Sequence, residues 1–109
     1  MKRAIRKSGL FIVDFDLQYR WYFQQAGEDL ARRYLHAVDS ALEKLSNLPD
    51  IGRPRHFPQP ELHGIRSFSV ERPFDVHLIF YRFDEQHVDA WRIMHGARDL
   101  PNRLAEPIS

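Results

Sequence analysis

The clearest pattern of apolar and polar residues lies in the C-terminal half of the chain, where two apolar runs flank a charged turn. Residues 76–83 are rich in β-branched and aromatic side chains and are short, which favours a strand. The turn at 83–87 leads into a second strand, 88–95, that ends before Gly96. Its two faces are predicted to carry Val88, Ala90, Arg92 and Met94 on one side, and Asp89, Trp91, Ile93 and His95 on the other. Because both faces include apolar residues, we expect this hairpin inside a sheet rather than at its rim.

Two amphipathic helices are predicted before these strands. Residues 9–26 lack proline, and their apolar residues recur every three or four positions, which is the period of a helix face. This stripe consists of Leu10, Val13, Leu17 and Trp21. Residues 28–47 have the most regular period, with Ala31, Leu35, Val38, Leu42 and Leu45 on one face. Since only Gly27 separates the two segments, they are predicted to form an antiparallel helical hairpin whose stripes rest on a sheet.

The remaining segments complete one domain over residues 1–109. Residues 2–7 are a candidate first strand, and residues 65–70 are a candidate strand before the hairpin. Residues 50–63 contain three prolines and one glycine, so a loop is predicted there. The order is one strand, two helices and three strands. It predicts an α+β fold, a two-layer sandwich in which the helical hairpin covers one face of a mainly antiparallel sheet.

Composition excludes several classes of protein. Hydrophobic residues make up 43% and charged residues 28%, as in an ordinary folded domain. No apolar run approaches the roughly 20 residues that span a bilayer, and the N-terminus lacks the apolar centre of a signal peptide, so a cytoplasmic protein without membrane contact is expected. The absence of cysteine excludes disulfides and thiol chemistry. The six histidines show no metal-ligand spacing, so no metal or other cofactor is expected.

Charge is nearly balanced, but most of the basic residues are arginines. The formal net charge of +1 is too small for a typical nucleic-acid-binding domain, so direct sequence-specific binding to nucleic acid is not expected. Of the 16 basic residues, only Lys2, Lys7 and Lys44 are lysines. Arginine is preferred where a planar fork must hold a carboxylate or phosphate in a partly dry contact. A genome rich in G and C, whose codons favour arginine, explains the same excess.

The first helix carries more aromatic surface than one sheet face can cover. Phe11, Phe15 and Tyr22 form a second stripe beside the first one. Leaving such side chains in water forgoes roughly 1.5–3 kcal/mol each, and contiguous exposed apolar patches mark interfaces. We therefore predict that an amphipathic helix of a partner binds in a groove between the two helices. The alternative is that the second helix already covers this stripe; the residues able to do so are Leu30, Tyr34 and Ala41.

Four short strings support a family resemblance because of their order and spacing. They are LPDIGRPR (48–55), LHGIRSF (62–68), LIFYR (78–82) and RIMHGARD (92–99). Together with the β-α-α-β-β-β order, they resemble the ParE side of the RelE/ParE superfamily of type II toxin–antitoxin toxins, over about residues 3 to 104. The resemblance implies a small toxin encoded beside an antitoxin of the ParD type that wraps and neutralises it. It also implies two kinds of target, since ParE-like members act on DNA gyrase and RelE-like members cleave mRNA on the ribosome.

RNA cleavage by the 2′-hydroxyl needs an acid, a base and cations around the phosphate. Arg66, Arg92 and His95 are the candidates for these roles. RelE-type nucleases resemble one another in a lysine-rich active surface and, often, an aromatic hydroxyl near the C-terminus. This chain departs from that pattern, with no lysine after Lys44 and no tyrosine after Tyr81. We therefore favour a protein without catalytic residues.

The same three residues also have structural explanations. An arginine on a strand often covers its neighbours with its stem while its head pairs with a carboxylate. The carboxylates available for such a pair are those of Asp89, Asp99 and Glu71. His95, next to Gly96, can bond a backbone carbonyl at the end of its strand.

The leading hypothesis is a non-catalytic inhibitor of DNA gyrase that a ParD-like antitoxin neutralises in a hetero-oligomeric complex. The predicted antitoxin-binding residues are Phe11, Phe15, Tyr19, Tyr22 and Tyr34. The predicted target-binding residues are Arg92, Arg98 and Arg103, together with the loop arginines Arg53 and Arg55. Two alternatives stay open: a RelE-like, ribosome-dependent mRNA endoribonuclease and an interaction module without toxicity.

Overall fold

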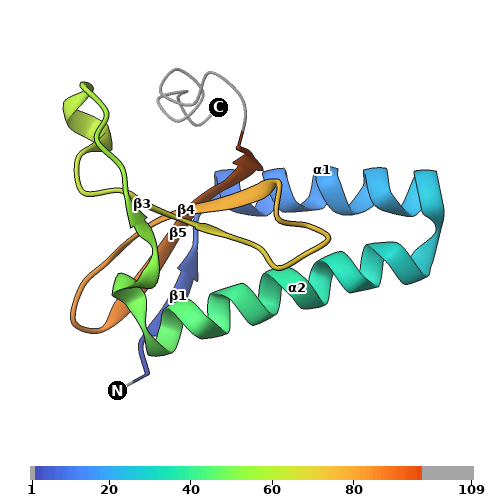
Figure 1. The fold of residues 1–109 in the computed structure, drawn as a ribbon, viewed down its shortest axis with the longest axis horizontal. Helices are drawn as coiled ribbons and strands as arrows, with labels where there is room; N and C mark the ends of the chain where they lie inside the picture. Colours follow the sequence, from blue (N-terminus) through green and yellow to red (C-terminus); the bar gives the residue numbers. More distant parts are fainter. Residues whose placement is uncertain (1, 97–109) are drawn as a thin grey trace.

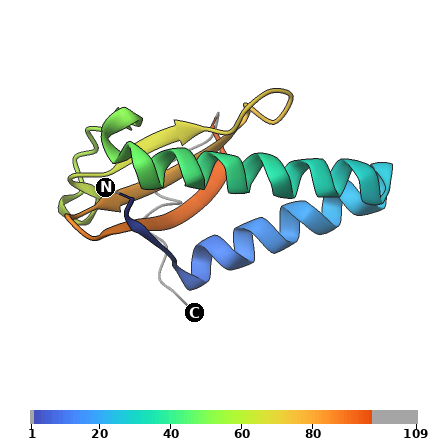
Figure 2. The same cartoon turned by 90° about the horizontal axis from the view of Figure 1, so that it is seen from below.

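The structure, a computed structural model, describes residues 2–96. A short strand precedes two helices, and a meander of strands follows them (Figure 1). The elements are β1 Ala4–Lys7, α1 Gly9–Ala26, α2 Glu28–Asn47, η1 Pro49–Ile51, β2 Arg53–Pro54, η2 Pro60–Leu62, β3 Arg66–Ser69, β4 His77–Phe83 and β5 His87–His95, where η marks a short 3-10 turn. The two helices lie side by side, and the turn between them extends beyond the strands (Figure 2). The predicted α+β fold with a helical hairpin is confirmed.

Five strands form one sheet in the order β1-β5-β4-β3-β2. β1 runs parallel to β5, and all other neighbours are antiparallel. The β4–β5 hairpin therefore lies inside the sheet, as predicted. The rim beside β3 is β2, a strand of two residues in a segment for which the sequence predicts a loop. Pro54 is tolerated there because an edge strand does not need its missing N–H.

Two apolar clusters, one on each face of the sheet, make up the core. The cluster on the helical face includes Phe11, Tyr34, Val38, Leu42, Leu45, Ile79, Tyr81, Val88, Ala90 and Ile93. The cluster on the opposite face consists of Leu62, Ile65, Leu78, Phe80 and Met94, with Phe57 and Trp91 packed against it. The segment between β2 and β3 thus covers part of the face that has no helices. β4 contributes to both clusters because successive side chains of a strand point to opposite sides.

A bulge in β5 changes the alternation that the sequence predicts. The register between β4 and β5 shifts between Phe80 and Tyr81, so Trp91 is an extra residue on β5. One inserted residue exchanges the faces of all residues after it, because the period of a strand is two. Val88, Ala90 and Ile93 belong to the cluster on the helical face, and Met94 to the other. The predicted grouping of Val88, Ala90, Arg92 and Met94 on one face is therefore wrong beyond residue 90.

α1 faces the sheet with a different stripe from the predicted one. Val13, Leu17 and Trp21, predicted to face the core, are 54%, 64% and 53% exposed. The aromatic stripe predicted at an interface lies inside instead, with Phe11 2% exposed and Phe15 packed against the core. Aromatic side chains bury about 150–250 Å² each, and Phe15 and Tyr22 find aromatic partners inward because both pack on Tyr34.

Tyr34 of α2 is the centre of this aromatic packing. Its ring is fully buried, and the ring centroids of Phe15, Tyr22 and Phe74 lie 5.3, 5.1 and 5.6 Å from its own. The residues predicted to bind a partner, Phe11, Phe15, Tyr19, Tyr22 and Tyr34, are all in this core or packed against it. The surplus exposed stripe assumed for them is therefore wrong, and α2 does cover it.

His77, at the start of β4, is buried beneath the same aromatic rings. Its Nε2 lies 2.8 Å from the Tyr22 hydroxyl, and its ring stands edge-on to Tyr34. Burial, with a smaller contribution from nearby His95, lowers the pKa of His77 from 6.5 to about 4. The imidazole is therefore neutral at pH 7 and can accept a hydrogen bond. Burial also raises the pKa of Tyr22, which keeps its hydroxyl protonated as the donor.

Stability is expected to fall as the pH is lowered from 7 to 5. Between pH 6.5 and about 4, His77 binds more protons in the unfolded than in the folded state, so acid favours unfolding. This residue should remove about 2 kcal/mol from the free energy of unfolding between pH 7 and pH 5, measured by urea denaturation. His77→Gln should abolish that part of the pH dependence, and His63→Gln, at an exposed histidine, should not. Equal pH dependence in both variants would contradict the assignment.

Candidate functional site

Five of the eight exposed large hydrophobic residues among residues 2–96 belong to α1. Three of them, Val13, Leu17 and Trp21, are four residues apart and therefore form one line along the helix. We call this line the α1 ridge. Ile12 and Phe23, also about half exposed, lie on α1 outside this line.

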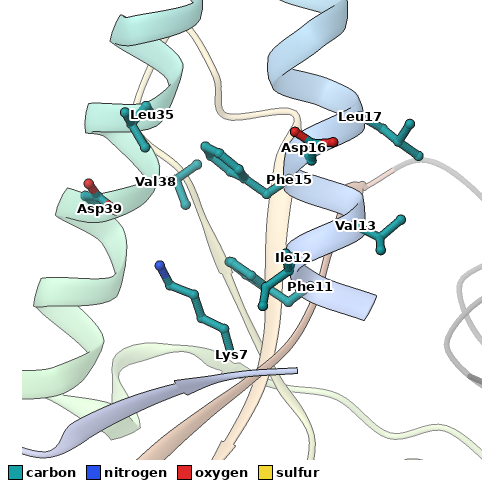
Figure 3. A pocket seen from close by; sticks show the side chains of 10 residues that line it. All are labelled: Lys7, Phe11, Ile12, Val13, Phe15, Asp16, Leu17, Leu35, Val38 and Asp39. Carbon is teal, nitrogen blue, oxygen red and sulfur yellow. The ribbon is translucent and has the colours of Figure 1, made fainter. Parts of the chain in front are cut away.

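A hollow of about 380 Å³ lies between α1 and α2 (Figure 3). Its lining residues are Lys7, Phe11, Ile12, Val13, Phe15, Asp16, Leu17, Leu35, Val38 and Asp39. Figure 3 shows Phe11 and Phe15 pointing from α1 towards α2, whereas Val13 and Leu17 point to the other side of α1. We call this hollow the interhelical groove. Its lining is mainly apolar, and its charged members are Lys7, Asp16 and Asp39.

A second hollow, of about 520 Å³, lies between α1 and the end of β5. Its lining residues are Asp14, Leu17, Gln18, Trp21, Ile93, Met94 and His95. Leu17 lines both hollows, so the α1 ridge stands between them. The ridge and its two flanking hollows adjoin one another, and neighbouring exposed apolar side chains of this kind mark interaction sites.

Arg92 is not exposed to a target. Its side chain is 4% exposed and donates two hydrogen bonds to the Asp14 carboxylate, from Nε and Nη2, both 2.8 Å long. The backbone N–H of Ile93 also donates to this carboxylate, at 3.3 Å. β1 pairs with β5 only as far as Ala90. Asp14 therefore links α1 to the part of β5 that follows this pairing. The exposure assumed for Arg92 as a target-binding residue is wrong, and its carboxylate partner among the described residues, Asp14, was not predicted. Of the predicted partners, Asp99 lies outside the described residues.

The structure does not bring the three candidate catalytic residues together. Arg66 on β3 pairs with Tyr81 on β4, which in turn pairs with Ala90 on β5. His95 pairs with His77, which is four residues from Tyr81 on β4, so it lies about 13 Å further along the sheet at the rise of a strand. Arg66 donates hydrogen bonds to two backbone carbonyls, and Arg92 forms the buried pair described above. His95 is exposed and lines the second hollow.

The other predicted target-binding residues, Arg98 and Arg103, lie outside the described residues. Within residues 2–96, no three histidine, aspartate or glutamate side chains are grouped in a way that could hold a metal ion. Neither helix of that range is long and apolar enough to cross a membrane.

Sequence reasoning missed Ile12 and assigned the α1 ridge to the core. The spacing of Val13, Leu17 and Trp21 was a correct signal for one helix face, but two stripes on the same helix competed for burial. Side-chain size alone does not distinguish them, because the exposed stripe contains Trp21; packing of Phe15 and Tyr22 against Tyr34 decides which stripe is buried.

Comparison with known proteins identifies the family. A family model described as the ParE toxin of the type II toxin–antitoxin system parDE matches residues 5–100. Toxin ParE3 of Caulobacter vibrioides is 31% identical over 93 residues, which cover 85% of this chain and 86% of ParE3. The chain therefore belongs to the ParE toxin family of type II toxin–antitoxin systems.

Solved structures share the fold at low sequence identity. A chain of the chromosomal ParDE toxin–antitoxin system from P. aeruginosa matches with a TM-score of 0.68 at 18% identity, covering 86% of this chain and 96% of that one. A chain of the RelBE2 toxin–antitoxin complex from Mycobacterium tuberculosis matches with a TM-score of 0.58 at 21% identity, covering 87% and 99%. The RelE/ParE-like architecture predicted from the sequence is confirmed.

Proposed function

We propose that this protein inhibits DNA gyrase without a catalytic site of its own, and that a ParD-like antitoxin encoded beside it neutralises it. The observation that carries the proposal is the family match over residues 5–100, together with the 31% identity to ParE3. The P. aeruginosa structure of the same fold is a ParDE system, which supports an antitoxin partner. Because gyrase acts on chromosomal DNA, the proposed place of action is the bacterial cytoplasm.

The antitoxin is proposed to bind across the α1 ridge and into the interhelical groove. Such a surface suits an amphipathic segment, whose apolar side chains enter the groove and whose polar side chains meet its charged rim. Phe11 and Phe15, predicted from the sequence as contacts, belong to this proposal as lining of the groove. Tyr22 and Tyr34 support the groove from the core behind it.

Replacing Ile12 or Leu17 with glutamate is expected to weaken antitoxin binding by at least about 30-fold, because each variant buries an unpaired carboxylate in an apolar contact. Both side chains are more than half exposed, so the toxin should keep its fold and its thermal midpoint. Isothermal titration with the antitoxin from the neighbouring gene measures the affinity.

The matched control is Val76→Glu, at an exposed valine that lines neither hollow. It should bind the antitoxin like the wild type. Phe15→Ser tests the sequence-based assignment, and it should lower the thermal midpoint because Phe15 stacks on Tyr34. Wild-type affinity in folded Ile12→Glu and Leu17→Glu variants would exclude the groove as the antitoxin site.

Gyrase inhibition and mRNA cleavage can be distinguished by supercoiling assays and by primer extension on cellular mRNA. Arg66 and His95 lie two strands apart and are offset by about 13 Å along the strands, and Arg92 is in a buried pair. This arrangement supports a protein that acts by binding. The purified toxin should therefore inhibit supercoiling by purified gyrase, and primer extension after its expression should show no codon-aligned cuts. Codon-aligned cuts with normal supercoiling would instead identify a RelE-like endoribonuclease. Normal growth without the antitoxin would indicate an interaction module.

A further inference from the structure

The turn that follows α2 is held in place by side chains from the middle of the sheet. The fully buried Tyr81 hydroxyl donates to the carbonyl of Pro49 at 2.6 Å and accepts from the N–H of Gly52 at 2.9 Å. Arg66 donates from Nη1 to the carbonyls of Asp50, at 3.1 Å, and Gly52, at 2.9 Å. Four hydrogen bonds therefore fix the backbone of this turn, although loops of this kind are commonly mobile.

The side chains that this rigid turn directs outward are partly apolar. Leu48 is 57% and Ile51 40% exposed. Apart from the residues on α1, only Val76 is a further exposed large hydrophobic residue within residues 2–96. Exposed apolar side chains on a backbone fixed in advance are suited to docking, because little ordering entropy is lost on binding.

Positive charge surrounds the same turn. Arg53, in the adjoining β2, is exposed and forms no ion pair within residues 2–96. The guanidinium group of Arg66 lies against the turn, where it donates to the carbonyls of Asp50 and Gly52. Two guanidinium groups, those of Arg53 and Arg66, thus accompany one carboxylate on the turn, that of Asp50. A partner of negative charge is therefore favoured here.

We propose that the turn surface, defined by Leu48, Ile51 and Arg53, docks on an acidic surface of the target protein that contains an apolar pocket. Leucine and isoleucine fit a protein pocket, whereas the phosphate backbone of a nucleic acid offers them no apolar contact. The identity of the target as gyrase rests on the proposed function, but the assignment of the surface does not. This surface follows the end of α2 and adjoins β2 and β3, whereas α1, which carries the ridge, packs against β5 (Figure 1).

The test uses the full-length toxin with the substitutions Leu48→Ser, Ile51→Ser and Arg53→Glu combined, and Arg53→Glu alone as the variant least able to disturb folding. Val76→Ser is the matched control. Growth arrest without the antitoxin, affinity for purified gyrase and affinity for the antitoxin are measured for each. The triple variant should lose growth arrest and bind gyrase at least 30-fold more weakly, and Arg53→Glu should weaken gyrase binding several-fold. Antitoxin affinity should stay within twofold of the wild type in all of them.

Other outcomes separate the surface from its target. If the wild type does not bind gyrase but the variants still lose growth arrest, the docking surface stands and the gyrase assignment fails. If the folded variants arrest growth like the wild type, the docking surface is wrong whatever the target is. Binding of the wild type and the variants to a duplex DNA probe is also measured, by fluorescence polarisation. Loss of DNA binding in the variants, with gyrase binding unchanged, would also overturn the proposal.

Discussion

Replacing Asp14 with alanine is expected to lower the free energy of unfolding by about 3–5 kcal/mol, measured by urea denaturation at pH 7. The Asp14 side chain is 13% exposed and forms a bidentate pair with the buried Arg92. Without the carboxylate, a guanidinium remains in a position from which water is largely excluded, and the N–H of Ile93 loses its acceptor. The loss includes both hydrogen bonds of the bidentate pair and the cost of keeping the guanidinium away from water.

Asp16, two residues further along the same helix, provides the control. It pairs with Arg20 at 3.0 Å, and both side chains are more than half exposed. Asp16→Ala should therefore cost only about 0.3–0.5 kcal/mol. Replacing the buried pair by apolar residues, Asp14→Leu with Arg92→Met, should recover most of the stability that Asp14→Ala loses. Equal small losses from Asp14→Ala and Asp16→Ala would show that burial of the Asp14 pair has no energetic consequence.

The order of elements could be predicted from the sequence because each signal was local. Gly27 ends one helix and precedes the next, and the hairpin of β4 and β5 has apolar residues on both faces of its strands. Periods of 3.6 and 2 identify such elements without knowledge of the fold. The family resemblance used the same local strings, and the comparisons bear it out.

Contacts between distant segments could not be predicted in the same way. The pair of Asp14 and Arg92 joins residues 78 positions apart, and no local pattern distinguishes Asp14 from Asp16. The bulge at Trp91 depends on one unmatched residue in the pairing of two strands. The face of α1 that is buried depends on which stripe packs better against Tyr34. Each of these is decided by tertiary packing.

The structure has a groove between the helices, as the sequence predicts, but a different stripe of α1 faces outward beside it. A groove between the helices exists, and Phe11 and Phe15 line it. The exposed ridge beside it consists of residues that a single-helix argument assigns to the core. α1 presents this ridge firmly, because the Ser8 hydroxyl donates to the carbonyl of Trp91 at 2.5 Å and Asp14 holds β5 six residues later.

Replacing Gly52 with alanine is expected to lower the free energy of unfolding by about 3 kcal/mol or more. A methyl group at this position comes within 2.6 and 2.7 Å of Cε1 and Cζ of Tyr81, and even closer to its hydroxyl. Tyr81 is fully buried at the centre of the sheet and cannot move aside without displacing its neighbours. Either the ring shifts or the turn lifts, and both break the hydrogen bonds of the hydroxyl to Pro49 and Gly52.

Gly9→Ala is the matched control for this substitution, since both changes restrict the unfolded chain equally. A methyl group on Gly9 meets no atom within 4 Å, and Gly9 begins α1, so the variant should be unchanged or more stable by about 0.4–1 kcal/mol. The difference between the two variants therefore measures the contact with Tyr81 alone. If the Gly52→Ala and Gly9→Ala variants unfold at the same urea concentration, the turn can move away from Tyr81 at no cost and is not rigid. In that case the surface formed by Leu48 and Ile51 is not preorganised. The docking proposal would then rest on the positive charge around the turn alone.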